Sequence, residues 1–275
     1  MIYAAPAKLN LFLHVVGRRA DGYHLLQTVF RFLDFGDSLH ITPRQDGEIC
    51  LLSPLAGVPL QQDLCWRAAQ LLKNHTRCRL GADITLTKRL PMGGGLGGGS
   101  SDAATVLLAL NRLWNLQLPR AELQILALQL GADVPIFVFG RTAFAEGVGE
   151  VLTPWQPAKR SYVVLMPPVH VATPAIFAHS GLTRNTHSIK ITDLFDGFGR
   201  NDLEPIASKL YPEIATYLDW LKEYGDARMT GSGACVFADF SSREQAEQAF
   251  AQRPENVKGF IAEGIDKHPL YEWAD

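Results

Sequence analysis

A run of glycines in the first half of the chain constrains its fold more than any other feature. From Pro91 to Asp102 the sequence reads PMGGGLGGGSSD, with six glycines in seven positions. Glycine reaches positive φ angles and has no Cβ, so successive backbone N–H groups of such a run can converge on one anion, at an entropic cost to folding. Two serines at the end of the run add hydroxyl donors. No ordinary turn needs this composition, so the run predicts a loop that holds a large, oxygen-rich ligand.

The glycine run is expected to connect a strand to a helix. Residues 82–88 alternate as a strand does, and Ser101 to Asn115 carries apolar residues at helical spacing. A helix N-terminus has about half a positive charge and free N–H groups, so the loop and the helix start together predict a phosphate site. Lys88 and Arg89 add positive charge beside it. A flexible glycine linker is the alternative, although linkers are rarely set between a strand and an amphipathic helix.

The length and charge of the chain limit what else it can be. At 275 residues it is long enough for two packed domains, and we expect residues 1–153 and 154–275, with the boundary in the proline-containing segment 153–159. A hydrophobic fraction of 47%, a charged fraction of 20% and a net charge of −2 are typical of a soluble globular protein. They argue against a general binder of nucleic acid or of membrane surfaces.

Cysteine usage and the N-terminus indicate the compartment. The four cysteines are scattered without a CxxC pair, which predicts reduced thiols rather than a disulfide framework or a zinc site. The sequence shows neither a basic and apolar leader nor a run of about 20 apolar residues. We therefore expect a cytoplasmic protein.

Two polar side chains near the N-terminus are expected to lie side by side. Residues 5–17 alternate as a half-buried strand, which places Lys8 and Asn10 together on the face away from the aliphatic core. A solvated strand face explains this pattern equally well. Beyond this segment, the patterns predict strands over 25–33, 40–43, 47–52, 162–166 and 259–265 and helices over 63–75, 201–208, 212–224 and 242–252.

A carboxylate follows the second helix after the glycine run. The helix is predicted over 121–130, is stopped by Gly131, and is followed by an expected strand over 136–139. Pro135 favours extended geometry at the residue before it, so Asp133 would stand in a short, stiff connection between helix and strand. A simple helix-end hydrogen-bond acceptor is the alternative interpretation of this aspartate.

Three familiar motifs of nucleotide-binding proteins fit the sequence poorly. Gly93, Gly95 and Gly98 satisfy GxGxxG, but the acidic residue expected about 20 positions later in a dinucleotide site is missing. A Walker A loop needs Gly-Lys, and the chain has no such pair. The triplet at residues 34–36 reads DFG as in protein kinases, but it precedes the glycine run and no HRD segment exists, so a turn is expected there.

Instead, three blocks together resemble the motifs of the GHMP small-molecule kinases. They are PAKLN at 6–10, the glycine run with its serines, and TGSG at 230–233. With RADGYH at 19–24 and GADVP at 131–135 in matching order, residues 5–238 are similar to the branch of this family that phosphorylates the 2-hydroxyl of cytidine diphosphate methylerythritol in the non-mevalonate isoprenoid pathway. One position of the pattern varies: Asp102 follows the serines, where Asn would also fit. No function is attached to Asp102.

The resemblance implies a fold and a mechanism. The fold would be α+β with two domains, an N-terminal domain like ribosomal protein S5 domain 2 and a ferredoxin-like C-terminal domain, with the active site in the cleft between them. Asp133 would take the proton of the acceptor hydroxyl, and Lys8 would orient that carboxylate and offset charge on the transferred phosphoryl group. ATP and Mg²⁺ would be the cofactors, with no protein ligand of the metal identifiable.

The resemblance also implies two sets of binding residues. The ATP set comprises Lys88 beside the adenine together with Pro91, Met92, Gly93, Gly94, Gly95, Leu96, Gly97, Gly98, Gly99, Ser100 and Ser101. The acceptor set comprises Asn10, Tyr23, His24, Thr173, Pro174, Phe177, Gly231, Ser232 and Gly233. Tyr23 and Phe177 would hold the cytosine ring between them while His24 reads its polar edge. Ordinary rim packing for Phe177 and a plain tight turn for 231–233 are the alternatives.

Other functions are left open at this point. A kinase for another small alcohol, such as homoserine or a mevalonate derivative, would share most motifs, but the Tyr23–His24 block argues against it. A nucleotide-binding module without turnover would need neither Lys8 nor Asp133. The expected partner is a small-molecule substrate, with no nucleic acid and no membrane, and the chain is expected to be a monomer or a homodimer.

Overall fold

The structure is a computed structural model and describes residues 1–274. Its strands are β1 (Ile2–Arg18), β2 (His24–Arg44), β3 (Ile49–Leu51), β4 (Gly81–Thr87), β5 (Ala143–Glu146), β6 (Val151–Pro154), β7 (Ser161–Leu165), β8 (Arg228–Met229), β9 (Val236–Phe240) and β10 (Gly259–Ile265). Its helices are α1 (Leu64–Thr76), α2 (Gly98–Leu113), α3 (Arg120–Leu130), α4 (Val134–Phe139), α5 (Thr173–Ala178), α6 (Glu204–Leu210), α7 (Pro212–Lys222) and α8 (Arg243–Ala251). Short 3-10 turns lie at Leu60–Gln62, Ile191–Asp193 and Tyr271–Trp273.

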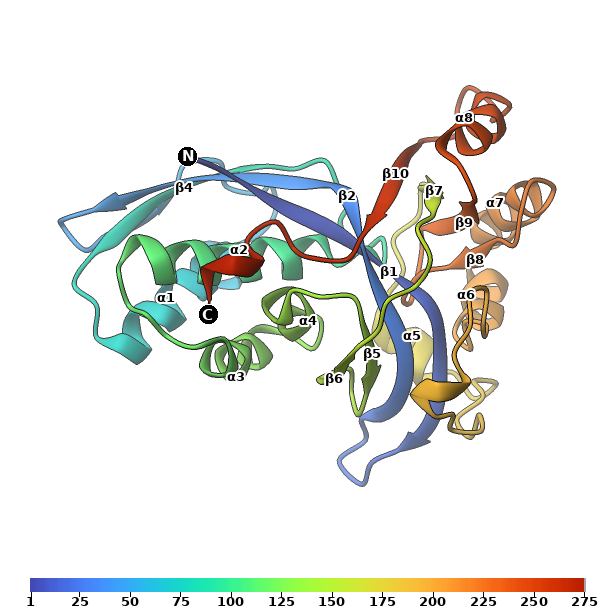
Figure 1. Ribbon diagram of the computed structural model, residues 1–275, viewed down its shortest axis with the longest axis horizontal. Helices are drawn as coiled ribbons and strands as arrows, with labels where there is room; N and C mark the ends of the chain where they lie inside the picture. Colours follow the sequence, from blue (N-terminus) through green and yellow to red (C-terminus); the bar gives the residue numbers. More distant parts are fainter. Residues whose placement is uncertain (275) are drawn as a thin grey trace.

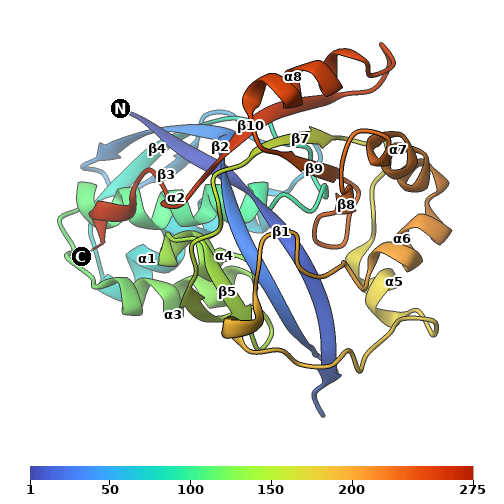
Figure 2. The same cartoon turned by 45° about the vertical axis from the view of Figure 1, so that its right-hand side comes forward.

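The long strand β2 joins the two halves of the molecule. It pairs antiparallel with β1, β4, β5 and β10, and the sheet runs in the order β3-β4-β2-β10-β7-β9-β8. Figure 1 shows β1 and β2 crossing the molecule, with α1, α2 and α3 on one side and α6, α7 and α8 on the other. In Figure 2, which is turned so that this side of the molecule comes forward, α5, α6 and α7 lie to the right of β1. Helices and strands are therefore grouped in two parts around one shared pair of strands.

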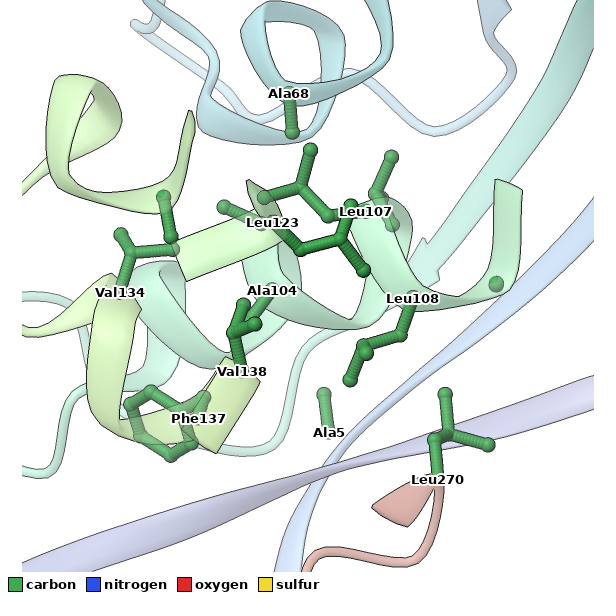
Figure 3. Packing of buried hydrophobic residues seen from close by; sticks show 14 of the residues in the cluster. Ala5, Ala68, Ala104, Leu107, Leu108, Leu123, Val134, Phe137, Val138 and Leu270 are labelled. Atoms are coloured by element: carbon green, nitrogen blue, oxygen red, sulfur yellow. The ribbon is translucent and has the colours of Figure 1, made fainter. Parts of the chain in front are cut away.

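Helix α2 is the centre of the N-terminal core. Most of its residues are buried, including Ala104, Leu107 and Leu108, which explains why apolar residues occur all round it. Figure 3 shows these three side chains in the middle of the cluster, with side chains from α1, α3, α4 and β1 around them. Because α2 begins at the glycine run, the packing that buries the helix also fixes the position of the loop.

The C-terminal half has its own core, and a third cluster joins the two. Strands β7, β8 and β9 contribute to the second core with α6, α7 and α8. The joining cluster combines Leu9 of β1 and Leu96 of the glycine run with Val164 of β7 and Cys235. Leu96 is 1% exposed, so this single apolar side chain anchors the glycine run between the two halves.

The chain crosses between the halves more than once. After β10, residues 266–274 return to the N-terminal half, where Leu270 and Ala274 belong to the core around α2. Figure 1 shows this C-terminal segment beside α2. The predicted division at residues 153 and 154 stays a prediction. No helix within residues 1–274 is both long enough and apolar enough to cross a membrane.

The prediction of separate strands over 25–33 and 40–43, with a turn at 34–36, is wrong. Both lie in β2, and the DFG triplet forms an irregularity where the register with β1 shifts between Pro6 and Lys8. A Cβ atom on Gly36 would lie 2.1 Å from the carbonyl oxygen of Ala5. The glycine therefore permits a close approach inside the sheet, and the strand bends instead of ending.

The strand predicted over 136–139 is also wrong, because these residues belong to α4. Pro135 lies in the first turn of the helix, where the N–H that proline lacks would have no helical partner. Gly140, at φ +72°, ends the helix. A short, wholly apolar run is buried on all sides in either form, so its periodicity does not distinguish a strand from a helix.

Candidate active site

A cavity of about 590 Å³ lies where the two halves meet. Its walls come from both halves: Lys8, Asn10, Thr28, Phe30, Asp63, Leu64, Lys88, Asp102, Ala132, Asp133, Val148, Gly149, Thr173, Phe177, Leu203, Gly231, Ser232 and Gly233 are among them, with most of the glycine run. Four of the five motif blocks of the sequence are thus brought to one place, and the fifth, at 19–24, does not line the cavity.

The glycine run forms a fixed loop whose last part is already helical. Helix α2 begins at Gly98 rather than at Ser101 as predicted, because Gly97 at φ +71° turns the chain into it. The backbone N–H of Lys8 donates to the carbonyl of Leu96 at 2.9 Å, and the N–H of Cys235 donates to that of Gly94 at 3.1 Å. Anchored on both sides in this way, the loop is no flexible linker.

The first turn of α2 opens onto the cavity. Gly98, Gly99 and Ser100 line it, and the N–H groups at a helix start have no helical acceptor. The N–H of Ser101 already donates to Gly97 at 2.8 Å, and the buried Ser101 hydroxyl has no partner within residues 1–274. The loop and the helix start therefore have backbone donors at the cavity, and phosphate binding there stays a prediction, while Ser101 and Leu96 are not among the lining residues.

Lys8 and Asp133 meet in the wall of the cavity. The Lys8 ammonium lies 3.2 Å from Asp133 Oδ2 and donates to Asn10 Oδ1 at 2.6 Å. Lys8 and Asn10 are 2% and 3% exposed, so the polar side of β1 is buried at the cavity and is not a solvated strand face. Asp133 precedes α4, but in the described part of the chain its side chain makes no capping bond to that helix. Its carboxylate is therefore free to face Lys8.

Two further groups hold Lys8 and Asn10 in place. The Asn10 amide nitrogen donates to Thr28 Oγ1 at 3.0 Å, which turns the amide oxygen toward Lys8. The Lys8 ammonium also lies 5.2 Å from the centre of the Phe30 ring. Neither Thr28 nor Phe30 was predicted, because an isolated threonine or phenylalanine in a strand gives no signal of a site in one sequence.

The predicted acceptor residues lie across the cavity, mostly in the C-terminal half. Thr173 and Phe177 of α5 line it, and the Thr173 hydroxyl is 2.7 Å from that of Ser232. Gly231 and Gly233 line it too, whereas Pro174 is exposed and lies outside the lining. The turn at 231–233 is held by Asn201, whose amide donates to the carbonyls of Met229 and Gly231 at 2.7 and 2.8 Å. Asn201 was not predicted as a site residue.

The segment at 19–24 reaches this wall through His24. The His24 ring packs on Phe177 with ring centres 4.9 Å apart, and Arg184 Nε donates to His24 Nε2 at 3.1 Å. Burial lowers the pKa of His24, with the charges of Arg184 and Arg18 adding to the effect. Tyr23 is 65% exposed and is not among the lining residues. The cytosine sandwich between Tyr23 and Phe177 stays a prediction.

The oxygen groups of the cavity suit a magnesium ion carried by a nucleotide. Mg²⁺ prefers oxygen ligands and takes one or two from the protein when phosphates and water supply the rest. The Ser100 hydroxyl and the Asp133 carboxylate both line the cavity. Over residues 1–274 no group of three or more His, Cys, Asp or Glu side chains is placed to hold a metal ion. The donor set therefore fits a cation held chiefly by the triphosphate.

Family profiles match both halves of the chain. The GHMP kinases N terminal domain matches residues 63–141, and the GHMP kinases C terminal domain matches residues 190–259. The chain is 60% identical over 271 residues to 4-diphosphocytidyl-2-C-methyl-D-erythritol kinase of Thiobacillus denitrificans, covering 98% of each chain. It is 57% identical over 270 residues to the kinase of the same name from Dechloromonas aromatica, again covering 98% of each.

Solved structures with a similar fold include a kinase of the same kind as these relatives. A crystal structure of 4-(cytidine 5'-diphospho)-2C-methyl-D-erythritol kinase superposes with a TM-score of 0.85 at 33% identity, covering 96% of this chain and 99% of that one. A crystal structure of mevalonate kinase reaches a TM-score of 0.71 at 16% identity and shares the fold. The predicted two-domain α+β fold is confirmed.

Proposed function

The chain belongs to the GHMP kinase family, and we propose that it transfers the γ-phosphoryl group of ATP to the 2-hydroxyl of 4-diphosphocytidyl-2-C-methyl-D-erythritol. The products are the 2-phosphate and ADP, and the reaction belongs to the non-mevalonate isoprenoid pathway. One observation supports this function above the others: the pair formed by Lys8 and Asp133 lies in a cavity that is lined by both the glycine run and several of the predicted acceptor residues.

The pair supplies the chemistry at the acceptor hydroxyl. The Asp133 carboxylate, 39% exposed, is open to a ligand and takes the proton of the hydroxyl as it attacks phosphorus. The buried Lys8 ammonium holds the carboxylate and offsets negative charge on the phosphoryl group during transfer. A positioned base contributes about 10²–10⁴-fold to the rate, and positioning and electrostatics supply much of the rest in phosphoryl transfer.

The walls around the pair divide between donor and acceptor. The N–H groups of the glycine run and of the first turn of α2 bind the phosphates of ATP. Mg²⁺ would accompany the triphosphate and offset its charge, and Ser100 and Asp133 are two of the oxygen-bearing residues in the lining that would help to hold it. Phe177 and His24 pack on each other at the acceptor side, where Phe177 and Tyr23 would hold a flat cytosine ring while His24 reads its polar edge; such stacking is worth about 1–3 kcal/mol per base.

Phosphorus NMR tests the assignment. The protein is incubated with Mg-ATP and the cytidylyl diphosphate substrate, and formation of a phosphomonoester is followed for the wild type, for Asp133→Asn and for Asp219→Asn. Asp219 is an exposed carboxylate on α7, so its variant is the matched control. We expect product from the wild type and the control and almost none from Asp133→Asn.

Two outcomes would contradict the proposal. Homoserine or mevalonate phosphorylated faster than the cytidylyl substrate would assign the protein to another branch of the family. Nearly full activity of Asp133→Asn would remove Asp133 as the base while leaving the kinase assignment in place.

We also propose the division into domains 1–153 and 154–275 and a monomeric or homodimeric state. Limited proteolysis would test the domain boundary, and light scattering would test the oligomeric state.

A further inference from the structure

Arg184, which the proposed mechanism does not use, ties the end of α5 to the first residue of β2. Its Nη2 group donates to the carbonyls of Phe177 and His179 at 2.8 and 2.9 Å. Its Nη1 group donates to the carbonyl of Leu182 at 3.1 Å, and its Nε donates to His24 Nε2 at 3.1 Å. Four of the five N–H groups of the guanidinium are therefore engaged, which fixes the orientation of this half-buried side chain.

The contact with Arg184 determines which nitrogen of His24 carries the proton. A guanidinium has donors only, so His24 Nε2 must offer its lone pair to Arg184. A neutral histidine ring has one N–H group, which is then on Nδ1. A doubly protonated ring would place an N–H group of His24 against the N–H group of Arg184. Burial, together with the charges of Arg184 and Arg18, lowers the pKa of His24 and favours the neutral ring.

The Nδ1–H group of His24 is open to a ligand. Within residues 1–274 the bond to Arg184 is the one hydrogen bond of the ring. His24 Nδ1 is also not shut off from solvent, in contrast to the buried atoms His14 Nδ1 and His268 Nε2. The ring lies against Phe177, which lines the cavity, with ring centres 4.9 Å apart. A donor of fixed identity therefore lies next to the aromatic ring that is proposed to stack on the base.

We propose that Arg184 selects the nucleobase of the acceptor by holding His24 as an Nδ1–H donor. On its polar edge cytosine has a hydrogen-bond acceptor at ring nitrogen N3, whereas uracil has an N–H group there. The Nδ1–H of His24 pairs with N3 of cytosine, but with uracil it meets a second donor, and neither N–H group is satisfied. Arg184 acts through His24 and is therefore a positioning residue. This inference rests on the proposed function because it assumes that the acceptor carries cytosine.

Nitrogen-15 NMR of the histidine side chains shows the tautomer of His24 without any turnover. The protein is labelled at its histidines, and the His24 signals are identified by their loss in His24→Phe. At about pH 8, where an ordinary histidine is neutral, we expect wild-type His24 to carry its proton on Nδ1 and none on Nε2. Arg184→Met keeps an aliphatic side chain without any donor, so both tautomers of His24 should be populated. Arg243→Met, at an exposed arginine on α8, is the matched control and should give the wild-type spectrum.

Steady-state kinetics tests the consequence for the base. At saturating Mg-ATP, kcat/KM is measured for the cytidylyl acceptor and for its uridylyl counterpart, in which uracil replaces cytosine. We expect the wild type and Arg243→Met to prefer the cytidylyl compound by about 10- to 100-fold, the effect of leaving a donor without an acceptor. His24→Phe keeps an aromatic ring without a donor and should lose most of this preference. Arg184→Met should gain activity on the uridylyl compound by about 5- to 10-fold, because a ring free to change tautomer can offer its Nδ1 lone pair to the N3–H of uracil.

The double variant Arg184→Met with His24→Phe separates positioning from general loosening of the wall. If Arg184 acts through His24, the double variant should show the same base preference as His24→Phe alone. A wild type that uses both acceptors equally well, a wild-type His24 protonated on Nε2, or an Arg184→Met that loses activity on both acceptors in proportion would overturn the role of Arg184. Failure of the wild type to phosphorylate either acceptor would overturn the proposed function, whatever tautomer NMR shows, so the two failures are distinguishable.

Discussion

The carbonyl oxygen of Thr230 lies 2.2 Å from the point that a Cβ atom on Gly95 would occupy. The hydroxyl of Thr230 accepts the backbone N–H of Asn10 at 2.9 Å and donates to the carbonyl of Gly95 at 3.3 Å. The two glycine-containing loops, from opposite halves of the chain, therefore touch backbone to backbone beside Lys8 and Asn10. This contact fixes the distance between the loop proposed to hold the phosphates and the turn proposed to face the acceptor.

Replacing Gly95 by alanine should separate the two loops. Alanine at φ +76° costs about 1–2 kcal/mol in any protein, and here its Cβ would also meet the backbone of Thr230. Gly57→Ala is the matched control, because Gly57 has φ +77° with nothing within 4 Å of its Cβ position among the described residues. We expect both variants to lower the free energy of unfolding in urea, and Gly95→Ala alone to lower kcat/KM by about 10²-fold.

The comparison of Gly95→Ala with Gly57→Ala separates the effect of backbone strain from the effect of the contact between Gly95 and Thr230. Equal losses of stability with unchanged kcat/KM in both variants would show that the contact with Thr230 does not position the reacting groups. A loss of activity in Gly57→Ala would show that the control acts on the site through some other route.

Features encoded in local sequence were predictable. The glycine run, the alternation that places Lys8 beside Asn10 and the cap at Asp63 depend on neighbours in the chain, and Asp63 accepts the N–H groups of Cys65 and Trp66 as expected of an N-cap. The resemblance of five blocks to one family then linked segments that no local pattern connects.

Features that depend on tertiary contacts were not predictable. The bond between Lys88 and Asp37 joins residues 51 positions apart, and nothing near Asp37 marks it as a buried partner. The helical form of α4 and the bend at Gly36 were missed because packing against other elements, rather than local preference, decides them. Single-sequence reasoning therefore found the groups expected to react and missed the groups that hold them.

Acid should destabilise the fold through His268. This side chain is 2% exposed, and burial, with a smaller contribution from the Arg120 charge, lowers its pKa to about 3. In the unfolded chain the histidine takes up a proton as the pH falls through about 6.5, whereas the folded protein does not until about pH 3. The contribution of His268 to stability is thus complete above pH 6.5 and is lost between pH 6.5 and 3, by at most about 1.4 kcal/mol per pH unit.

Urea unfolding at several pH values between 7 and 4 measures this slope. In His268→Asn the amide oxygen can still accept the N–H of Leu270, which His268 Nδ1 accepts at 3.0 Å, but no titrating group remains. We expect the variant to lose less stability on acidification than the wild type, and His187→Asn, at an exposed histidine, to behave as the wild type does. Parallel slopes in all three proteins would contradict the role of His268.

Removing the charge of Lys8 should stop the reaction and leave the fold intact. Lys8→Met keeps the length of the buried side chain, and the half-exposed Asp133 stays hydrated in the variant. The free energy of unfolding should therefore fall only by the cost of leaving Asn10 Oδ1 without its donor, about 1–3 kcal/mol. We expect kcat to fall by at least about 10²-fold with a smaller change in KM for ATP, because the ammonium acts mainly on the transferring phosphoryl group. Lys222→Met, at an exposed lysine on α7, is the matched control.

The double variant Lys8→Met with Asp133→Asn tests whether the two residues act as a unit. Their side chains are 3.2 Å apart, and groups that cooperate in one step show strongly non-additive losses. The double variant should therefore be about as slow as the slower single variant, measured as ADP release under saturating ATP and acceptor. Losses that multiply would show that Lys8 and Asp133 act independently, with Lys8 serving the nucleotide and Asp133 the hydroxyl. A kcat of Lys8→Met close to the wild-type value would instead make Lys8 a structural residue of β1.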